Sequence, residues 1–151
     1  MFKIRLFLAA SAVCVAAAAL AHSPEEDAID YRQGLMTVVG WNFGPLYAMV
    51  KGKTPFDAAE FSKHASRIAF LSDQLVEGFP KGSDKGHDTA AKPAIWESFD
   101  DFQSKAKDFN REALALADIA KGHDEAKDKE QYKKVANACK ACHDKYKKKD
   151  E

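Results

Sequence analysis

The spacing of the apolar residues is the strongest constraint on what this sequence can fold into. Between residues 95 and 120 they recur at alternating intervals of four and three, the repeat of a helix that buries one face. The set is Ile95, Phe99, Phe102, Ala106, Phe109, Ala113, Leu116 and Ala120. No stretch shows the alternation of period two that indicates strands. The sequence therefore predicts an all-α protein.

Three further segments show the same helical spacing, separated by short stretches rich in Gly, Pro and Lys. We expect helices over residues 25–50, 54–77, 93–121 and 124–148, with a loop over residues 79–92. Helices of comparable length joined by short connections favour an antiparallel up-down-up-down four-helix bundle.

Each helix is expected to bury one stripe of residues. The first stripe is Ile29, Gln33, Met36, Gly40, Phe43, Tyr47 and Val50; the second is Phe61, Ala65, Ile68, Leu71 and Leu75; the last is Tyr132, Val135, Cys139, Cys142 and Tyr146. Pro45 is expected to kink the first helix without ending it. Thr54 is expected to cap the second helix, with Pro55 at its first position.

The N-terminal segment is typical of a cleaved secretory signal. Lys3 and Arg5 precede an apolar run over residues 6–21, which ends in the small-residue pattern Ala19-Leu20-Ala21. The run is shorter than the roughly 20 residues that a membrane-spanning helix needs. We therefore expect cleavage after Ala21, no membrane anchor, export to the periplasm, and one mature domain over residues 22–151.

Charge and composition exclude several functions. Removing residues 1–21 takes away two basic side chains and leaves 21 basic against 23 acidic ones, so nucleic acid is not expected as a partner. No acid–base pair or nucleophile constellation is visible, and we expect no enzyme activity. Three histidines in polar surroundings, His64, His87 and His123, are expected to be solvated.

The motif Cys139-Lys140-Ala141-Cys142-His143 is the one specific chemical signature. Cys-x-x-Cys-His is the pattern of covalent c-type haem attachment. On a helix, Cys139 and Cys142 lie on the same side, where both thiols can join the vinyl groups of one porphyrin, and His143 can ligate its iron. The motif predicts one haem c per chain.

Two other uses of a cysteine pair fit the sequence less well. A structural zinc site, as in a metal-binding helical module, would need a fourth ligand beside Cys139, Cys142 and His143, and the remaining histidines show no paired spacing. A thioredoxin-like dithiol expects a βαβ context and cysteines at a helix start.

The whole of residues 23–148 resembles the class II c-type cytochromes, the cytochrome c-prime and cytochrome c-556 group. The resemblance rests on the haem motif near the C-terminus and on segments at the helix starts and ends. These are Tyr31-Arg32-Gln33-Gly34-Leu35-Met36, Thr54-Pro55-Phe56-Asp57-Ala58-Ala59, Lys92-Pro93-Ala94-Ile95-Trp96 and Cys142-His143-Asp144-Lys145-Tyr146-Lys147.

The resemblance implies roles for individual residues. Cys139 and Cys142 match the thioether attachments, and His143 matches the proximal ligand. Arg32 and Gln33 match positions that approach the haem propionates. Lys147 stands where family members usually carry an arginine beside the imidazole, which keeps the charge but not the planar fork.

Met36 matches the position that faces the distal side of the iron. In cytochromes c-556 a methionine there ligates the iron, which gives a six-coordinate, low-spin electron carrier. In cytochromes c-prime the site is blocked without ligation, which leaves a five-coordinate iron open to neutral diatomic gases such as NO and CO. The sequence does not choose between the two, and our hypothesis favours the cytochrome c-prime kind.

Two partner surfaces are also implied. Family members often dimerise through the first two helices, and Leu35, Val39 and Leu46 are candidates for such a homodimer surface. The lysines at the C-terminal end, Lys145 and Lys147 to Lys149, are either a solvated helix terminus or a docking patch for an acidic periplasmic redox partner.

Overall fold

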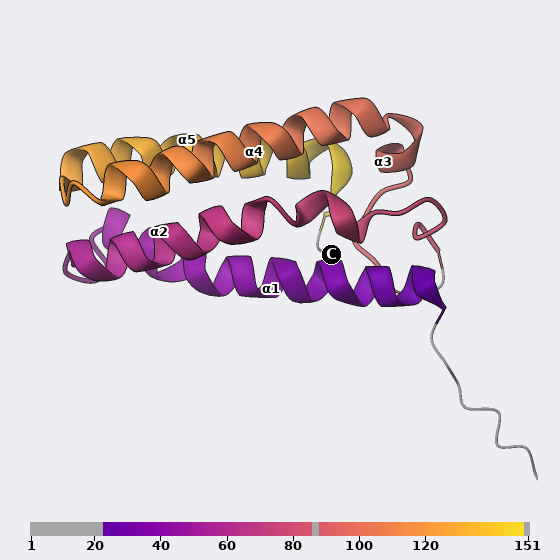
Figure 1. Ribbon diagram of the computed structural model, residues 1–151, viewed down its shortest axis with the longest axis horizontal. Helices are drawn as coiled ribbons and strands as arrows, with labels where there is room; N and C mark the ends of the chain where they lie inside the picture. The colour runs from indigo at the N-terminus through magenta and orange to yellow at the C-terminus, as the bar shows by residue number, and fades with distance from the viewer. Residues whose placement is uncertain (1–22, 86–87, 150–151) are drawn as a thin grey trace, which may run out of the picture.

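The computed structural model describes residues 23–85 and 88–149. Its helices are α1 (Pro24–Val50), α2 (Ala58–Ser72), the 3-10 helix η1 (Leu75–Gly78), the short α3 (Ala94–Glu97), α4 (Phe99–Ala120) and α5 (Glu125–Tyr146). The four long helices alternate in direction and form two layers, α1 with α2 and α4 with α5 (Figure 1). The predicted up-down-up-down four-helix bundle is confirmed. The predicted signal over residues 1–21 lies outside the described residues.

The helices pack unevenly around the core. Contacts are dense between α1 and α2, between α2 and α4, and between α4 and α5, whereas α1 and α5 make few contacts with each other. The most completely buried large side chains include Phe61, Ile68, Phe102, Leu116 and Val135. Burial of this apolar surface is the main stabilising contribution to the bundle.

Helix α1 begins with a capping box and continues through its proline. The Ser23 amide donates to Glu26 Oε2 at 2.9 Å, and the Glu26 amide donates to Ser23 Oγ at 3.2 Å. Because Pro45 falls within α1 without ending it, the prediction of one continuous first helix is confirmed.

The expected buried stripe of α1 is confirmed at Ile29 and wrong along the rest of the helix. The buried positions are Ile29, Arg32, Leu35, Asn42, Leu46 and Met49, which face α2 and the core. The predicted row, represented by Met36 and Phe43, is only partly buried and faces α5 instead. Leu35 and Leu46 are therefore core residues, and Leu46 is 0% exposed, so neither is available as a dimer surface.

The start of α2 differs from the prediction. The helix begins at Ala58 and is capped by Asp57, whose Oδ1 accepts from the amides of Ala59 and Glu60 at 2.9 and 3.0 Å. Thr54 does not cap it, because the Thr54 amide lies 3.4 Å from Ala48 O in the turn that closes α1. Gly52, with a φ of 66°, permits that turn.

The predicted third helix is interrupted at Ser98, which has φ −135° and ψ 52°. The preceding short helix α3 turns Trp96 toward the loop, where its Nε1 donates to Pro80 O at 2.9 Å and its ring lies 6.1 Å from that of Phe79. These contacts override the helical pattern, although every member of the predicted stripe except the half-buried Phe99 is buried.

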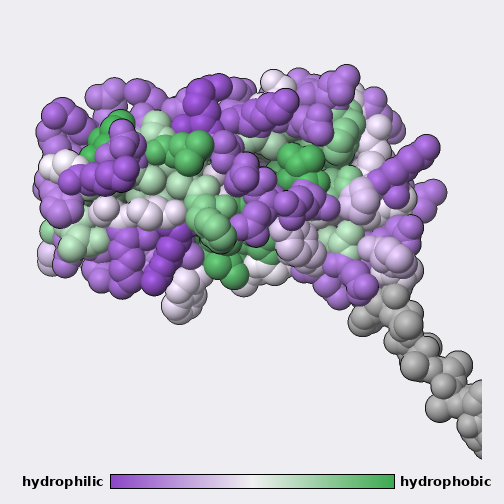
Figure 2. Space-filling view, in the orientation of Figure 1, coloured by the Kyte–Doolittle hydropathy of each residue, from purple (hydrophilic) through white to green (hydrophobic). Residues whose placement is uncertain are grey.

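The surface is mostly hydrophilic, with hydrophobic side chains gathered near the middle of the visible face (Figure 2). Residues 23–85 and 88–149 contain no helix that is both long and apolar enough to cross a membrane. An antiparallel bridge between Ala91 and Lys147 is the strand-like pairing in this part of the chain.

Candidate functional site

The Cys-x-x-Cys-His motif lies in the last two turns of α5. Cys139 and Cys142 are half-buried and pack against the hydrophobic core, whereas His143 is exposed. Burial raises the pKa of the Cys139 thiol to about 11, with a smaller contribution from Cys142, and burial also raises the pKa of Cys142. The two sulfurs are not joined in a disulfide.

This environment disfavours the two other uses of the cysteine pair. Disulfide exchange is carried out by cysteines of low pKa, whereas burial raises the pKa of both Cys139 and Cys142. In the described residues no group of three or more His, Cys, Asp and Glu side chains is arranged to hold a metal ion.

The partly buried face of α1 lies opposite the motif. Phe43 on α1 stacks on Tyr132 of α5, with ring centroids 4.7 Å apart. Because the two helices are antiparallel (Figure 1), seven residues back along α1 and seven residues forward along α5 lead to the same height. Met36 is therefore level with Cys139, about 10 Å along the bundle from the stacked rings.

Between Met36 and Phe43, the same face of α1 carries Gly40. A Cβ atom built on Gly40 would meet no atom within 4 Å. Contacts between α1 and α5 are also sparse, and the partly buried side chains of these two helices that pack against the core include Met36, Phe43, Cys139 and Cys142. A flat, largely apolar ring that is tethered at Cys139 and Cys142 fits such a place, so the residues present fit a haem.

Arg32 does not reach into solvent as a free cation. The residue is 3% exposed, and its terminal nitrogens donate to Gly78 O, Ser83 Oγ, Ser83 O and Thr89 Oγ1 at 2.8 to 3.0 Å. Its guanidinium carbon also lies 4.9 Å from the ring centroid of Phe79. Gln33, on the exposed side, donates from Nε2 to Asp88 O at 2.7 Å.

Lys147 lies just beyond the helix that carries His143. It has an extended conformation, with φ −103° and ψ 136°, and pairs with Ala91. The helical spacing of four residues from His143 therefore does not apply to the Lys147 side chain, although its amide still donates to His143 O at 3.0 Å.

Sequence reasoning missed a polar cluster behind the motif. Tyr146, which is buried, donates from its hydroxyl to Asp101 Oδ2 at 2.5 Å, and Lys145 Nζ donates to the same oxygen at 2.9 Å. These two hydrogen bonds lower the pKa of Asp101. Nothing in the spacing of α4 indicates this role for Asp101, because an exposed carboxylate on a helix is ordinary.

His64 also departs from expectation. It is buried, and its Nδ1 lies 3.0 Å from Oδ1 of Asn42, which joins α2 to α1. Burial lowers the pKa of His64, with Arg67 adding to the effect. His123 is exposed as expected, and His87 lies outside the described residues.

Fold and site together define a four-helix bundle with a c-type haem motif on its last helix, and comparisons with known proteins agree. The sequence profile of the cytochrome c' family matches residues 27–147. Cytochrome c' from Rubrivivax gelatinosus is 39% identical over 123 residues, covering 82% of this chain and 95% of the relative.

Solved structures give the same result. The cytochrome c prime of Shewanella frigidimarina has a TM-score of 0.81 at 46% identity, covering 85% of this chain and all of the other. A nitric oxide complex of a mutant cytochrome c prime from Alcaligenes xylosoxidans has a TM-score of 0.75 at 34% identity, covering 83% and 97%. The chain belongs to the cytochrome c' family, the class II c-type cytochromes, and its cofactor is haem c with its iron.

Proposed function

We propose that this cytochrome holds one haem between α1 and α5, tethered to Cys139 and Cys142, with His143 as the axial ligand and an open distal side beside Met36. The observation that supports this most directly is the register of the two helices. It sets Met36 level with Cys139, and Gly40, where a Cβ atom would meet nothing within 4 Å, lies on the same face of α1. When bound, the haem supplies an iron that carries one electron or takes a small neutral ligand.

The attachment chemistry suits neutral thiols. Each S–H adds across one vinyl C=C: the sulfur bonds to one carbon, the hydrogen goes to the other, and no electrons leave the system. Because Cys139 and Cys142 lie on one side of α5, both additions reach the same ring. The half-buried position of the thiols keeps the tethered edge against the core.

The distal side favours neutral diatomic ligands over charged ones. Met36 and Phe43 are apolar, and moving a charged ligand from water into such surroundings is unfavourable. A relative from Alcaligenes xylosoxidans has been solved with nitric oxide. We infer binding of NO and CO here, alongside electron transfer to periplasmic redox partners, with no turnover of an organic substrate.

The alternative function differs by one bond. Met36 lies level with Cys139 on the α1 face toward α5, and if its thioether ligated the iron the protein would be a low-spin carrier of the cytochrome c-556 kind. That arrangement would close the distal side to gases.

Optical and low-temperature paramagnetic-resonance spectra of the purified holoprotein, with and without NO or CO, separate the two. We expect the wild type to give a high-spin spectrum that shifts when gas is added. The Met36→Leu variant is also expected to be high-spin. A low-spin spectrum that gas does not move, and that Met36→Leu converts to high-spin, would contradict the gas-binding proposal and establish the electron carrier.

The proposal includes export and maturation. We propose cleavage after Ala21 and a periplasmic holoprotein of residues 22–151 with one haem. Intact-mass measurement of the periplasmic fraction is expected to give the 130-residue chain plus one haem. A mass that retains residues 1–21, or that lacks haem after expression in a host competent for attachment, would contradict it.

A further inference from the structure

Arg32 makes an unusually complete set of hydrogen bonds for a side chain of α1. Nη1 donates to Gly78 O at 3.0 Å and to Ser83 Oγ at 2.8 Å, while Nη2 donates to Ser83 O at 2.8 Å and to Thr89 Oγ1 at 2.9 Å. All four terminal N–H groups are thus used, which leaves only the Nε–H. Every acceptor belongs to the segment that follows α2.

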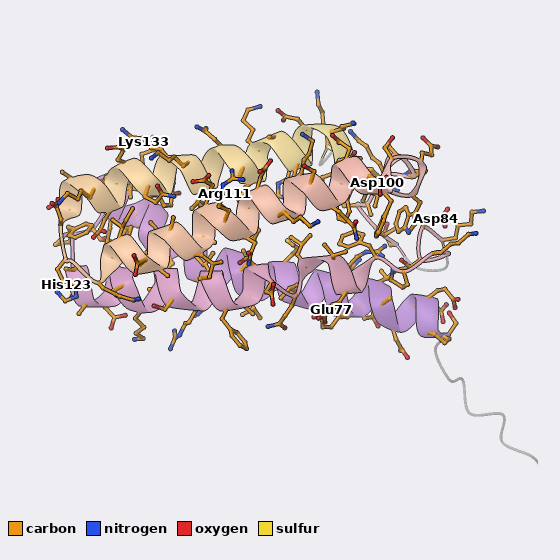
Figure 3. The ribbon with its side chains drawn as sticks, turned by 45° about the horizontal axis from the view of Figure 1, so that its top comes forward. Glu77, Asp84, Asp100, Arg111, His123 and Lys133 are labelled. Atoms are coloured by element: carbon orange, nitrogen blue, oxygen red, sulfur yellow. The ribbon has the colours of Figure 1, made fainter. Side chains whose placement is uncertain are left out.

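The same segment is tied to α1 by other contacts. A Cβ on Gly78 would lie 2.6 Å from Arg32 Cβ, so only glycine permits this approach of η1 to α1. Ser83 is 0% exposed. At the exposed edge the Tyr31 hydroxyl donates to Glu77 Oε2. Figure 3 labels Glu77, which lies far from the turn that carries His123. Arg32 therefore anchors the buried residues of this segment, Gly78, Ser83 and Thr89.

Thr89 connects this unit to the end of α5. Its hydroxyl accepts from Arg32 and also from the Ala91 amide at 3.2 Å, while its carbonyl accepts from Lys148 Nζ at 2.8 Å. The next residues pair with the end of α5, since the Lys148 amide donates to Ala90 O at 2.7 Å and the Lys92 amide donates to Tyr146 O at 2.9 Å.

This pairing begins three residues after His143. The turn between them is also fixed from α4, through the hydrogen bond from Tyr146 to Asp101. The last turn of α5 therefore has two supports, Asp101 on one side and the segment 88–92 on the other. Only the second depends on α1.

We propose that Arg32 is a positioning residue for His143, acting through Thr89 and the bridge between residues 90–92 and 146–148. The inference rests on the proposed function, in which His143 is the axial ligand. It concerns the bonds of Arg32 to the segment that follows α2, and the propionate contact that the family resemblance implies is a separate expectation. The helix on the distal side of the haem thereby sets the orientation of the proximal imidazole.

Two variants of the holoprotein test this. Arg32→Lys keeps the charge but loses the planar fork, and Thr89→Val keeps the shape but loses the hydroxyl link. Arg111→Lys is the matched control. Arg111 on α4 (Figure 3) has a side chain that is 65% exposed and that, among the described residues, bonds to Asp108 and Glu112. The readout is the hyperfine-shifted proton NMR signals of the His143 ring in the ferric state, which report iron–imidazole geometry.

We expect both variants to keep covalent haem, to shift the His143 ring signals in the same direction, and to exchange the Lys148 amide about tenfold faster. Arg111→Lys should change neither. Unshifted ring signals in Thr89→Val would overturn the proposal, even if Arg32→Lys failed to fold. A shift in Arg32→Lys alone would also overturn it, because it would indicate direct contact with the haem. Failure of the proposed function would give a different result. If His143 were not the axial ligand, His143→Ala would have the same optical spectrum as the wild type.

Discussion

At the scale of single residues, Gly40 and Gly34 offer a matched comparison within α1. In both cases a Cβ atom would meet nothing within 4 Å, and both residues are exposed. Gly40 lies on the face of Met36 and Phe43, which points toward α5, and Gly34 does not. We predict that Gly40→Leu reduces haem attachment severalfold by filling the cofactor space, whereas Gly34→Leu leaves it unchanged.

Haem content per chain, from the alkaline pyridine spectrum, measures the effect. Because leucine stabilises a helix by about 1 kcal/mol relative to glycine, neither variant is expected to lose helical structure. Equal haem content in the two variants would show that the space beside Gly40 is not where the cofactor lies.

The buried environment of Asp128 leads to a prediction about the pH dependence of stability. It is 0% exposed, and among the described residues its two carboxylate oxygens are the buried side-chain atoms without a hydrogen-bond partner. Burial raises its pKa, and Asp124 adds to the effect. The folded state therefore binds this proton more tightly than the unfolded state does.

The sign of the pH dependence follows from that. Stability contributed by protonated Asp128 is fully present below the unfolded pKa of about 3.9 and is lost as pH rises through the folded value. We predict that Asp128→Asn, which cannot ionise, gains stability relative to wild type between pH 4 and pH 7. Urea unfolding of the holoproteins at both pH values checks this. A stability difference that is constant with pH would contradict it.

At the scale of secondary-structure elements, the start of α2 is testable by its two candidate caps. Asp57 accepts two amide hydrogen bonds, whereas Thr54 belongs to the turn that closes α1. We predict that Asp57→Ala lowers the free energy of unfolding by about 1 kcal/mol and that Thr54→Ala changes it by less than about half of that. Thermal or urea unfolding distinguishes them, and the opposite ranking would restore Thr54 as the cap.

The elements differ in how far the sequence predicts them. The four-three spacing specifies that four helices form, because any amphipathic helix must bury one face. It does not specify which row of α1 meets α2, since two adjacent rows carry apolar residues and one of them faces α5. The interruption at Ser98 depends on Trp96 reaching Pro80 O, a contact between segments 16 residues apart.

The residues of the site also differ in how far the sequence predicts them. Cys139, Cys142 and His143 are adjacent on one helix, so a local pattern suffices to predict them. The partners of Arg32 lie 46 to 57 residues away in a segment without periodicity, and no local signal marks Gly78, Ser83 or Thr89 as its acceptors.

At the scale of the whole molecule, the outer face of α1 and α2 carries exposed apolar side chains. Trp41 is 77% exposed and Phe70 is 73% exposed. Val38 and Phe70, with Asn42, Ser66, Arg67 and Leu71, line a shallow groove of about 310 Å³. These residues, and not Leu35 and Leu46, form the surface on which we expect a second copy of this chain to pack.

Sedimentation of the holoprotein at micromolar concentration tests the prediction. We expect twice the mass of one chain for wild type and a single-chain mass for Phe70→Glu, because a buried unpaired carboxylate is unfavourable at an apolar interface. Leu114→Glu on α4 is the control, since Leu114 is also exposed but lies on another helix. A wild type that sediments as one chain would rule out this dimer.

The helices between which we propose that the haem lies, α1 and α5, are the first and the last of the bundle. The chain therefore has to be synthesised and exported almost completely before both walls of the site exist. Until α5 docks, α1, α2 and α4 have each other to pack on, whereas the thiols remain accessible on an undocked C-terminal segment. With the haem in the proposed place, we expect its attachment to belong to the last stage of assembly, when α5 docks.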